Sequence, residues 1–300
     1  MGWLTTIVLI LLIYLLFNWV IYISKTTPDK ASYTQGIDRK VFNTTDLLNG
    51  HHDENLIRAN EYAELSDIVY RRPEKENIKS FFGWKHVPIP MIHSKSEKKL
   101  EHFYYEIWEL DEPSDLKTVA IIFRGTHKPT DWGANFRWLI RLLPFINIQD
   151  HYDQLNEIND SLIQAIYDYY PIPAEKIKIV TAGHSLGGGL AQFMAYLNPS
   201  VNLVYGFDPS PVTGYYDVKP KNRRRENRKG VVIYRMFESG EGLSFVRKFM
   251  STIYPAPLFK TEDPTLIRIR FSFKTGRNPV TQHSMNDLAL SLTEYKNKSS

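Results

Sequence analysis

A serine set between glycines is the residue of this sequence best suited to act as a nucleophile. Ser185 lies in Gly183-His-Ser-Leu-Gly187, between an apolar run at 177–182 and a helix-like run at 188–196. In a G-x-S-x-G elbow the serine sits on a sharp strand-to-helix turn, where the flanking glycines avoid collisions that Cβ atoms would cause. The helix start directs backbone N–H groups at the same point. The pattern therefore predicts an exposed, nucleophilic Ser185 hydroxyl.

The elbow also resembles that of a known protein family. Gly183-His-Ser-Leu-Gly-Gly-Gly189 is similar to the nucleophile elbow of class 3, or fungal-type, lipases of the α/β-hydrolase superfamily. The resemblance extends over roughly residues 55 to 295 and implies an α/β-hydrolase fold, with a mostly parallel central sheet flanked by helices. It implies hydrolysis of carboxylic esters of lipids, phospholipids among them, through an acyl-enzyme and with neither metal nor organic cofactor.

The general base is predicted from the order of residues along the chain. A serine hydroxyl needs a base to take its proton, and in this fold the partners follow the serine in the order acid, then histidine. Of the nine histidines, only His283 comes after Ser185. It follows the last predicted strand, where the family places its catalytic histidine.

The acid that orients this histidine has two main candidates at strand ends. Asp208, in Gly206-Phe-Asp-Pro209, follows a strand predicted at 201–207 and resembles the Gly-x-Asp-Pro of pancreatic-type lipases. Glu238 and Glu241 follow the next predicted strand, and Glu241 fits the class 3 placement with glutamate in place of aspartate. We favour Asp208, because aspartate is the commoner orienting residue and Pro209 would stiffen its turn, and keep Glu241 as the alternative acid.

A second strand end is expected to carry the oxyanion hole. Phe123-Arg-Gly-Thr126 resembles the corresponding strand end of class 3 lipases, and Asp131-Trp-Gly-Ala-Asn135 resembles the Trp-containing segment that follows it there. Two preset N–H donors stabilise the oxyanion by several kcal/mol. We expect the backbone amides of Thr126 and Leu186 to be these donors, and Arg124 to be structural.

The most hydrophobic part of the body follows this strand end. Residues 132–146 hold a run of Trp, Phe, Leu and Ile side chains, at the place where such lipases have a lid or acyl-binding flank. A buried core segment explains the same composition. His151, in Asp150-His-Tyr152, resembles a structural histidine of the family.

The amino-terminal stretch predicts a membrane anchor. Trp3 to Ile23 is almost uninterruptedly apolar, and as a helix it would span roughly 30 Å, the thickness of the hydrocarbon core. A signal peptide explains it less well, because no basic segment precedes it and no small-x-small cleavage site follows. The basic residues after it slightly favour a cytosolic body.

The chain is therefore expected to have three parts. Residues 1–24 form the transmembrane anchor, 25–54 a polar stalk, and 55–300 the α/β-hydrolase domain. Within the stalk, His51-His-Asp-Glu54 lacks the H-E-x-x-H spacing of a metal site and is interpreted as a solvated loop.

Further elements of the body follow from periodicity. We expect a helix at 56–69, strands at 102–110 and 117–123 in a hairpin, and a helix at 155–169. Later strands are expected at 231–237 and 268–273, before a last helix opening at 282. Residues 219–229 are predicted to form a basic loop, exposed to solvent or in contact with lipid phosphates.

Composition excludes some functions and leaves others open. The absence of cysteine excludes disulfides, thiolate metal sites and a cysteine nucleophile. A net charge of +4, from 37 basic and 33 acidic residues, is too small to indicate a nucleic-acid partner. The expected partners are an acyl-ester substrate and the membrane. A thioesterase, a peptidase or an inactive hydrolase fold that serves as a binding module would share most of these features.

Overall fold

The computed structural model describes most of the predicted hydrolase body and little of the chain before it. The described residues are 6, 8–15, 37–41, 58–71, 78–93, 104–125, 150–210, 212–238, 263–271, 273 and 283–299. Most of the predicted anchor at 1–24, residues 126–149 with the predicted lid, and the histidines at 51 and 52 lie outside this set. Across the described residues, no helix is both apolar enough and long enough to cross a bilayer.

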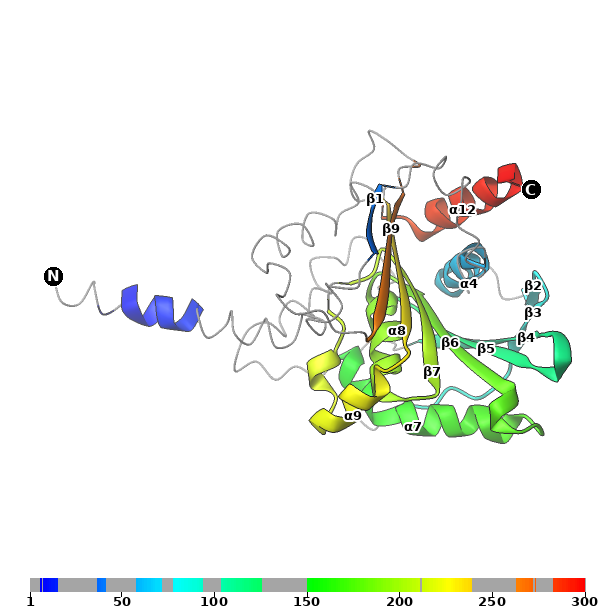
Figure 1. The fold of residues 1–300 in the computed structure, drawn as a ribbon, viewed down its shortest axis with the longest axis horizontal. Coiled ribbons are helices and arrows are strands. Elements are labelled where there is room, and N and C mark those ends of the chain that lie inside the picture. The colour runs from blue at the N-terminus through cyan, green and yellow to red at the C-terminus, as the bar shows by residue number, and fades with distance from the viewer. Residues whose placement is uncertain are drawn as a thin grey trace.

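A single sheet organises the described chain. Its strands are β1 (Ile37–Val41), β2 (Ser80–Phe81), β3 (Trp84–Val87), β4 (Tyr105–Asp111), β5 (Lys117–Phe123), β6 (Ile177–His184), β7 (Val201–Phe207), β8 (Val232–Glu238) and β9 (Thr265–Phe271). They form a 9-stranded sheet in the order β1-β9-β8-β7-β6-β5-β4-β3-β2. From β5 through β9 to β1 neighbouring strands are parallel, and from β2 to β5 they are antiparallel. The predicted α/β fold with a mostly parallel sheet is confirmed (Figure 1).

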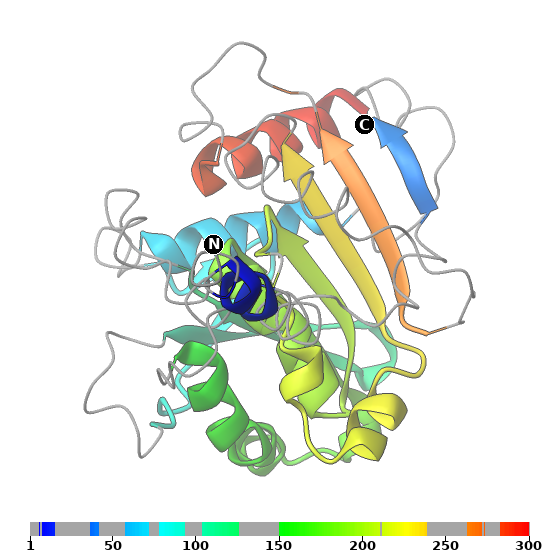
Figure 2. The ribbon, with the colours of Figure 1, turned by 90° about the vertical axis from the view of Figure 1, so that its left-hand side faces the viewer.

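Helices cover both faces of the sheet. The helices among the described residues of the body are α4 (Ala59–Tyr70), α7 (His151–Tyr169), α8 (Leu186–Leu197), α9 (Lys221–Asn227) and α12 (Met285–Ser299), with 3₁₀-helices η3 (Pro113–Asp115), η5 (Ala174–Lys176) and η6 (Tyr215–Asp217). α4 and α12 pack side by side on one face, and α7 and α8 pack on the other (Figures 1 and 2).

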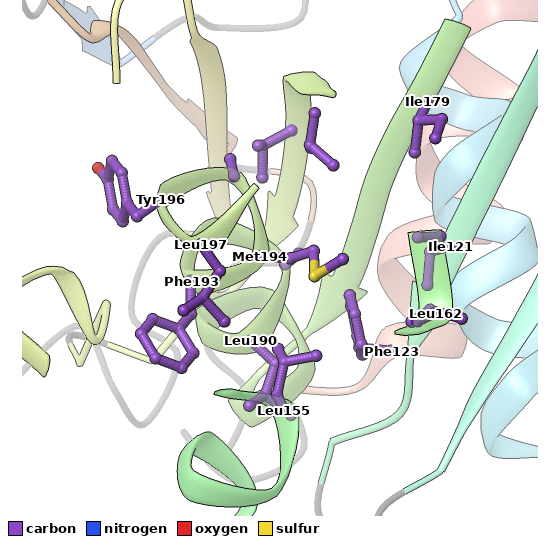
Figure 3. Close-up of a cluster of buried hydrophobic side chains, with 14 of the residues drawn as sticks. Ile121, Phe123, Leu155, Leu162, Ile179, Leu190, Phe193, Met194, Tyr196 and Leu197 are labelled. Atoms are coloured by element: carbon purple, nitrogen blue, oxygen red, sulfur yellow. The ribbon is translucent and has the colours of Figure 1, made fainter. Parts of the chain in front are cut away.

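Alternation along the buried strands explains these two layers. In β6, Ile179 belongs to the core under α7 and α8, while Val180 and Ala182 belong to the core under α4 and α12. Figure 3 shows the first core, where Leu190, Phe193, Met194 and Leu197 of α8 meet side chains of β5, β6 and α7. Each large apolar side chain buried in this way contributes about 1.5–3 kcal/mol, so the elbow helix is firmly fixed to the sheet.

The hairpin and helices expected around the elbow are confirmed to within a few residues, but the sheet is wider than expected. Within the predicted stalk at 25–54, residues 37–41 form β1, parallel to β9. The polar Ile-Asp-Arg-Lys-Val sequence is typical of an edge strand, which charged residues protect from further pairing. At the other edge, β2 and β3 form a hairpin that the sequence analysis did not predict.

The predicted basic loop at 219–229 is wrong in part, because Lys221–Asn227 form helix α9. Two arginines of α9 contact other parts of the protein. Arg223 bonds the Leu197 carbonyl at 3.0 Å and Asp160 at 2.9 Å, and Arg224 lies over the Tyr215 ring. α9 precedes the amino end of β8. It therefore lies near the amino ends of the parallel strands, whereas Ser185 and Asp208 follow the carboxyl ends.

Candidate active site

The nucleophile elbow has the predicted strand–turn–helix form. Ser185 is the single residue between β6 and α8, with φ 56° and ψ −122°. A positive φ is strained for a residue with a side chain, and such strain occurs at functional sites where the surrounding structure enforces it. Ser185 is partly exposed, although the residues on either side of it are buried. The turn therefore leaves Ser185 partly accessible to solvent between buried neighbours.

Close backbone contacts explain the two glycines of the motif. A Cβ atom on Gly183 would lie 2.5 Å from the carbonyl carbon of Gly187, and one on Gly187 would lie 2.2 Å from the carbonyl oxygen of Phe123. Both distances are far below van der Waals contact. Only glycine allows the start of α8 to approach the ends of β5 and β6 this closely.

Backbone hydrogen bonds join the elbow to the turn that follows β7. The Ser185 amide donates to the Phe207 carbonyl over 2.9 Å, and the Ser185 carbonyl accepts from the Ser210 amide over 2.9 Å. Asp208 lies between these two partners in sequence. The predicted nucleophile and the predicted acid are thus held by one pair of linked turns.

Asp208 is buried and fixed by its own hydrogen bonds. Its φ is 41°, and its Oδ1 accepts from the Glu238 amide over 2.9 Å, while its amide donates to the Met236 carbonyl over 2.7 Å. Aspartate tolerates this left-handed backbone better than most residues. The side chain is 0% exposed, so its carboxylate acts at low effective dielectric.

The structure brings His283 to this carboxylate. His283 is buried and lies just before α12. A ring nitrogen of His283 and an oxygen of Asp208 lie within 4.8 Å of each other. Asp208 and His283, from separate segments, therefore lie near each other, and the turn that carries Asp208 is bonded to the backbone of Ser185 at the carboxyl ends of parallel strands.

His184 also contacts this pair, and sequence reasoning missed it. Its Nε2 lies 4.0 Å from Asp208 Oδ2, and its ring centroid lies 4.6 Å from that of His283. Burial, and then the nearby His283, hold the pKa of His184 well below its usual value, against a hydrogen bond with the His283 backbone. Strand alternation was the available signal, because it places residue 184 on the face of Val180 and Ala182, toward α4 and α12.

The oxyanion donors are described only in part. Leu186 is the first residue of α8, so its amide is one of the free N–H groups at a helix start. Thr126 lies outside the described residues. The preceding Arg124 lies with its guanidinium carbon 4.5 Å from the Tyr104 ring centroid, in agreement with a structural role. Burial lowers the pKa of Arg124, while Tyr104, Tyr70 and Glu106 oppose this shift.

The two glutamates considered as alternative acids are Glu238, which the structure describes, and Glu241, which it does not. Glu238 is buried at the end of β8, where its Oε2 accepts from the Phe273 amide at 3.4 Å and its amide binds Asp208. Glu241 lies outside the described residues. His151 is the first residue of α7, beside the capping residue Asp150. The described geometry thus brings Asp208 to His283 and leaves Glu241 as a sequence-based alternative.

The same residues are the metal-binding candidates in the described part of the chain. His184, Asp208 and His283 each offer one ligand atom, and these atoms lie within 4.8 Å of one another. Two imidazoles and a carboxylate are donors that zinc accepts. In this position, however, the carboxylate and the His283 ring are the groups that activation of Ser185 needs, so we interpret the cluster as an acid–base site.

The fold and the site define the class of protein. A mostly parallel sheet, with a serine on a strand–helix elbow and an acid and a histidine after later strands, is an α/β fold like that of α/β-hydrolases. The family model of the Tle-like phospholipase domain matches residues 61–208, which include Ser185 and Asp208. No curated protein matches the chain.

Solved structures of lipases and esterases are similar to the chain at low identity. Lipase II from Rhizopus niveus has 17% identity and a TM-score of 0.38, with 65% of this chain and 78% of that chain covered. Esterase B from Lactobacillus rhamnosis has 10% identity and a TM-score of 0.36, with 83% and 97% covered. S-formylglutathione hydrolase from Staphylococcus aureus has 11% identity and a TM-score of 0.36, with 71% and 99% covered. Similarities of this size assign no function.

Proposed function

We propose that this protein is a serine hydrolase that cleaves carboxylic esters of lipids, with phospholipids as the first substrate class to test. The observation that supports the proposal is the pair of turns that joins the backbone of Ser185 to the residues on either side of Asp208, whose carboxylate lies within 4.8 Å of a His283 ring nitrogen. The match to a phospholipase domain supports lipid esters over other acyl substrates.

In the proposed reaction, His283 transfers protons between Ser185, the substrate and water. The Ser185 oxygen attacks the ester carbonyl while His283 takes the serine proton, and Asp208 stabilises the imidazolium that forms. The Leu186 amide, together with the expected Thr126 amide, donates to the oxyanion. His283 then gives its proton to the alcohol oxygen as the C–O bond of the tetrahedral intermediate breaks, which leaves the acyl group on the Ser185 oxygen. A water molecule, deprotonated by His283, hydrolyses the acyl-enzyme and regenerates the Ser185 hydroxyl.

We further propose that residues 1–24 tether this enzyme to its lipid substrate. The support is the apolar sequence from Trp3 to Ile23, together with the helical residues 8–15, whose apolar side chains are exposed. A bilayer would remove these side chains from water. The basic residues that follow the tether favour placement of the body at the cytosolic face.

Covalent labelling tests the catalytic proposal directly. A fluorophosphonate probe should label the wild-type protein and fail to label Ser185→Ala, whose folding circular dichroism can check. Rates on p-nitrophenyl esters of increasing chain length, phosphatidylcholine vesicles, triglyceride emulsions and an acyl thioester would then define the substrate. Equal labelling of both proteins would exclude Ser185 as the nucleophile, and a labelled enzyme active only on thioesters would exclude the lipid-ester assignment.

A further inference from the structure

His184 connects three segments that are far apart in the sequence. It precedes Ser185, its Nδ1 lies 3.2 Å from the Tyr70 hydroxyl at the end of α4, and its Nε2 lies 4.0 Å from Asp208 Oδ2 after β7. On a third side its ring lies against His283, before α12. With 4% of its surface exposed, the ring has little freedom to adopt another position.

The contacts of Tyr70 fix how this ring is held. The Tyr70 hydroxyl lies 3.3 Å from the His184 carbonyl oxygen as well as 3.2 Å from Nδ1, and the two rings pack edge to face. Burial raises the pKa of Tyr70, although Arg124 and a hydrogen bond with the Gly125 backbone oppose the shift. The hydroxyl therefore keeps its proton at neutral pH and can donate it.

Electrostatics distinguishes the two neutral forms of the imidazole. Nε2 lies 4.0 Å from Asp208 Oδ2, which is too far for a hydrogen bond, but an N–H there would stabilise the carboxylate charge electrostatically, whereas a lone pair on Nε2 would oppose that charge. With the proton on Nε2, Nδ1 can share the single Tyr70 hydroxyl proton with the His184 carbonyl oxygen, to which this hydroxyl donates over 3.3 Å. The second ring nitrogen of a buried histidine commonly has this role of selecting the tautomer.

We propose that His184 is a positioning residue of the active site, whose ring holds the Asp208 carboxylate and the His283 segment in register with Ser185, with Tyr70 fixing its tautomer. The inference rests on the proposed hydrolase function. It explains why the residue before the nucleophile is an imidazole here, since an apolar side chain of similar size could fill the space without making the polar contacts.

Kinetics at several pH values tests this role. The described titratable groups that face His184 are Tyr70 from α4, Asp208 after β7 and His283 from the segment before α12. Protonation of the base His283 would set the acidic limb of kcat/KM. In His184→Phe, a looser Asp208 would stabilise the His283 imidazolium less. We expect kcat to fall about 10- to 100-fold, as for other groups that orient a functional histidine, with KM little changed and the acidic limb moved to lower pH.

Conservative variants separate positioning from packing. His184→Gln keeps an N–H donor within reach of Asp208 and should recover most of the lost kcat and the original limb. Tyr70→Phe should lower kcat by about tenfold or less, the value of one hydrogen bond. Tyr62→Phe is the control, because it removes a hydroxyl from the same helix, α4, where the ring stacks on Tyr205 at a centroid distance of 4.3 Å rather than on His184. This variant should change neither kcat nor the acidic limb.

The outcomes distinguish this inference from the function on which it rests. A wild-type protein that a fluorophosphonate does not label would refute the hydrolase proposal itself. If the wild type is labelled and active, a folded His184→Phe with unchanged kcat and an unchanged acidic limb would refute only the positioning role. Equal losses of kcat in His184→Phe and His184→Gln, with the acidic limb at its original pH, would refute it as well. Should His184→Phe fail to fold, the other two variants decide: near-wild-type kinetics for His184→Gln together with a lower kcat for Tyr70→Phe would support the role, and an unchanged kcat for Tyr70→Phe would overturn it.

Discussion

The backbone amide of Ser185 donates a hydrogen bond to the carbonyl of Phe207, the residue before Asp208, over 2.9 Å. The proposed nucleophile and the proposed acid are therefore connected through the backbone. Both residues also have positive φ values, 56° and 41°. The two strained turns stabilise each other, because each supplies hydrogen-bond partners to the other.

Replacing Asp208 by asparagine should reduce kcat by on the order of 10⁴, as for the orienting aspartate of serine proteases. The asparagine Oδ1 can still accept from the Glu238 amide, so the fold should persist. Glu238→Gln is the matched control, because it changes a buried carboxylate at the neighbouring strand end and should retain most activity. Initial rates on a p-nitrophenyl ester would measure both effects.

The sequence-based alternative gives this experiment a third variant. If Glu241→Gln loses activity to the same degree while Asp208→Asn retains it, then Glu241 is the acid and Asp208 is a structural turn residue. If both carboxylate variants remain fully active, the site functions without an orienting acid.

A single methyl group at the elbow should be enough to disable the site. In Gly187→Ala the new Cβ would lie 2.2 Å from the Phe123 carbonyl oxygen, so α8 must shift away from β5, at a cost of roughly 1–3 kcal/mol. We expect loss of fluorophosphonate labelling together with a lower midpoint in urea. Gly230→Ala, where a Cβ meets nothing within 4 Å although φ is 70°, should be somewhat less stable but normally labelled. Normal labelling of Gly187→Ala would show that the close approach is not required.

The elbow and its flanking elements could be predicted because several signals agree there. The glycine spacing, the apolar strand and the chain order of Ser185, Asp208 and His283 all indicate one arrangement. His184 was missed because the motif treats its position as variable. Its role depends on Tyr70, which reaches it from α4, and a contact between residues so distant in sequence is not encoded in local pattern.

The missed elements have weak local signals for identifiable reasons. The β2–β3 turn is Phe82-Gly83, with φ values of 49° and 84°; such turns usually have Asn or Asp before the glycine. Lys221–Asn227 has no apolar stripe, and α9 is held by tertiary bonds such as that from Asn227 to the Tyr196 carbonyl at 2.9 Å. Context therefore outweighed local sequence at these positions.

Two arginines of α9 should differ in their contribution to stability. Arg223 bonds Leu197, Asn159 and Asp160, so Arg223→Gln should lower the free energy of unfolding by about 1–2 kcal/mol. Arg225 is exposed, and Arg225→Gln should stay within about 0.5 kcal/mol of the wild type. Urea denaturation compares the two, and equal losses would contradict the assignment of Arg223 to the fold.

Truncation separates the predicted anchor from the edge strand. Removal of residues 1–24 should yield an active protein that no longer sediments with membranes, because every described site residue follows residue 58. Removal of residues 1–54 also deletes β1, which pairs with β9, and should lower the thermal midpoint further. Loss of activity toward soluble esters in the shorter deletion would reveal a catalytic contribution from the anchor, and identical midpoints would show that β1 adds no stability.

The stability of the protein should depend on pH through His184. The pKa of this histidine in the folded protein lies well below its ordinary value of about 6.5, chiefly because the ring is buried. Between these two values the unfolded chain binds a proton that the folded chain excludes, so the free energy of unfolding decreases as pH falls from about 6.5 toward the folded pKa.

His184→Gln removes this proton and should make unfolding free energies, measured in urea at about pH 5, 6 and 7, less dependent on pH than in the wild type. One proton contributes a slope of at most about 1.4 kcal/mol per pH unit. His93→Gln controls for the loss of a histidine at an exposed position and should keep the wild-type slope. If His184→Gln and the wild type lose stability in parallel as the pH falls, His184 is not the group that resists protonation. The hypothesis that its imidazole is neutral, on which the positioning role depends, would then be wrong.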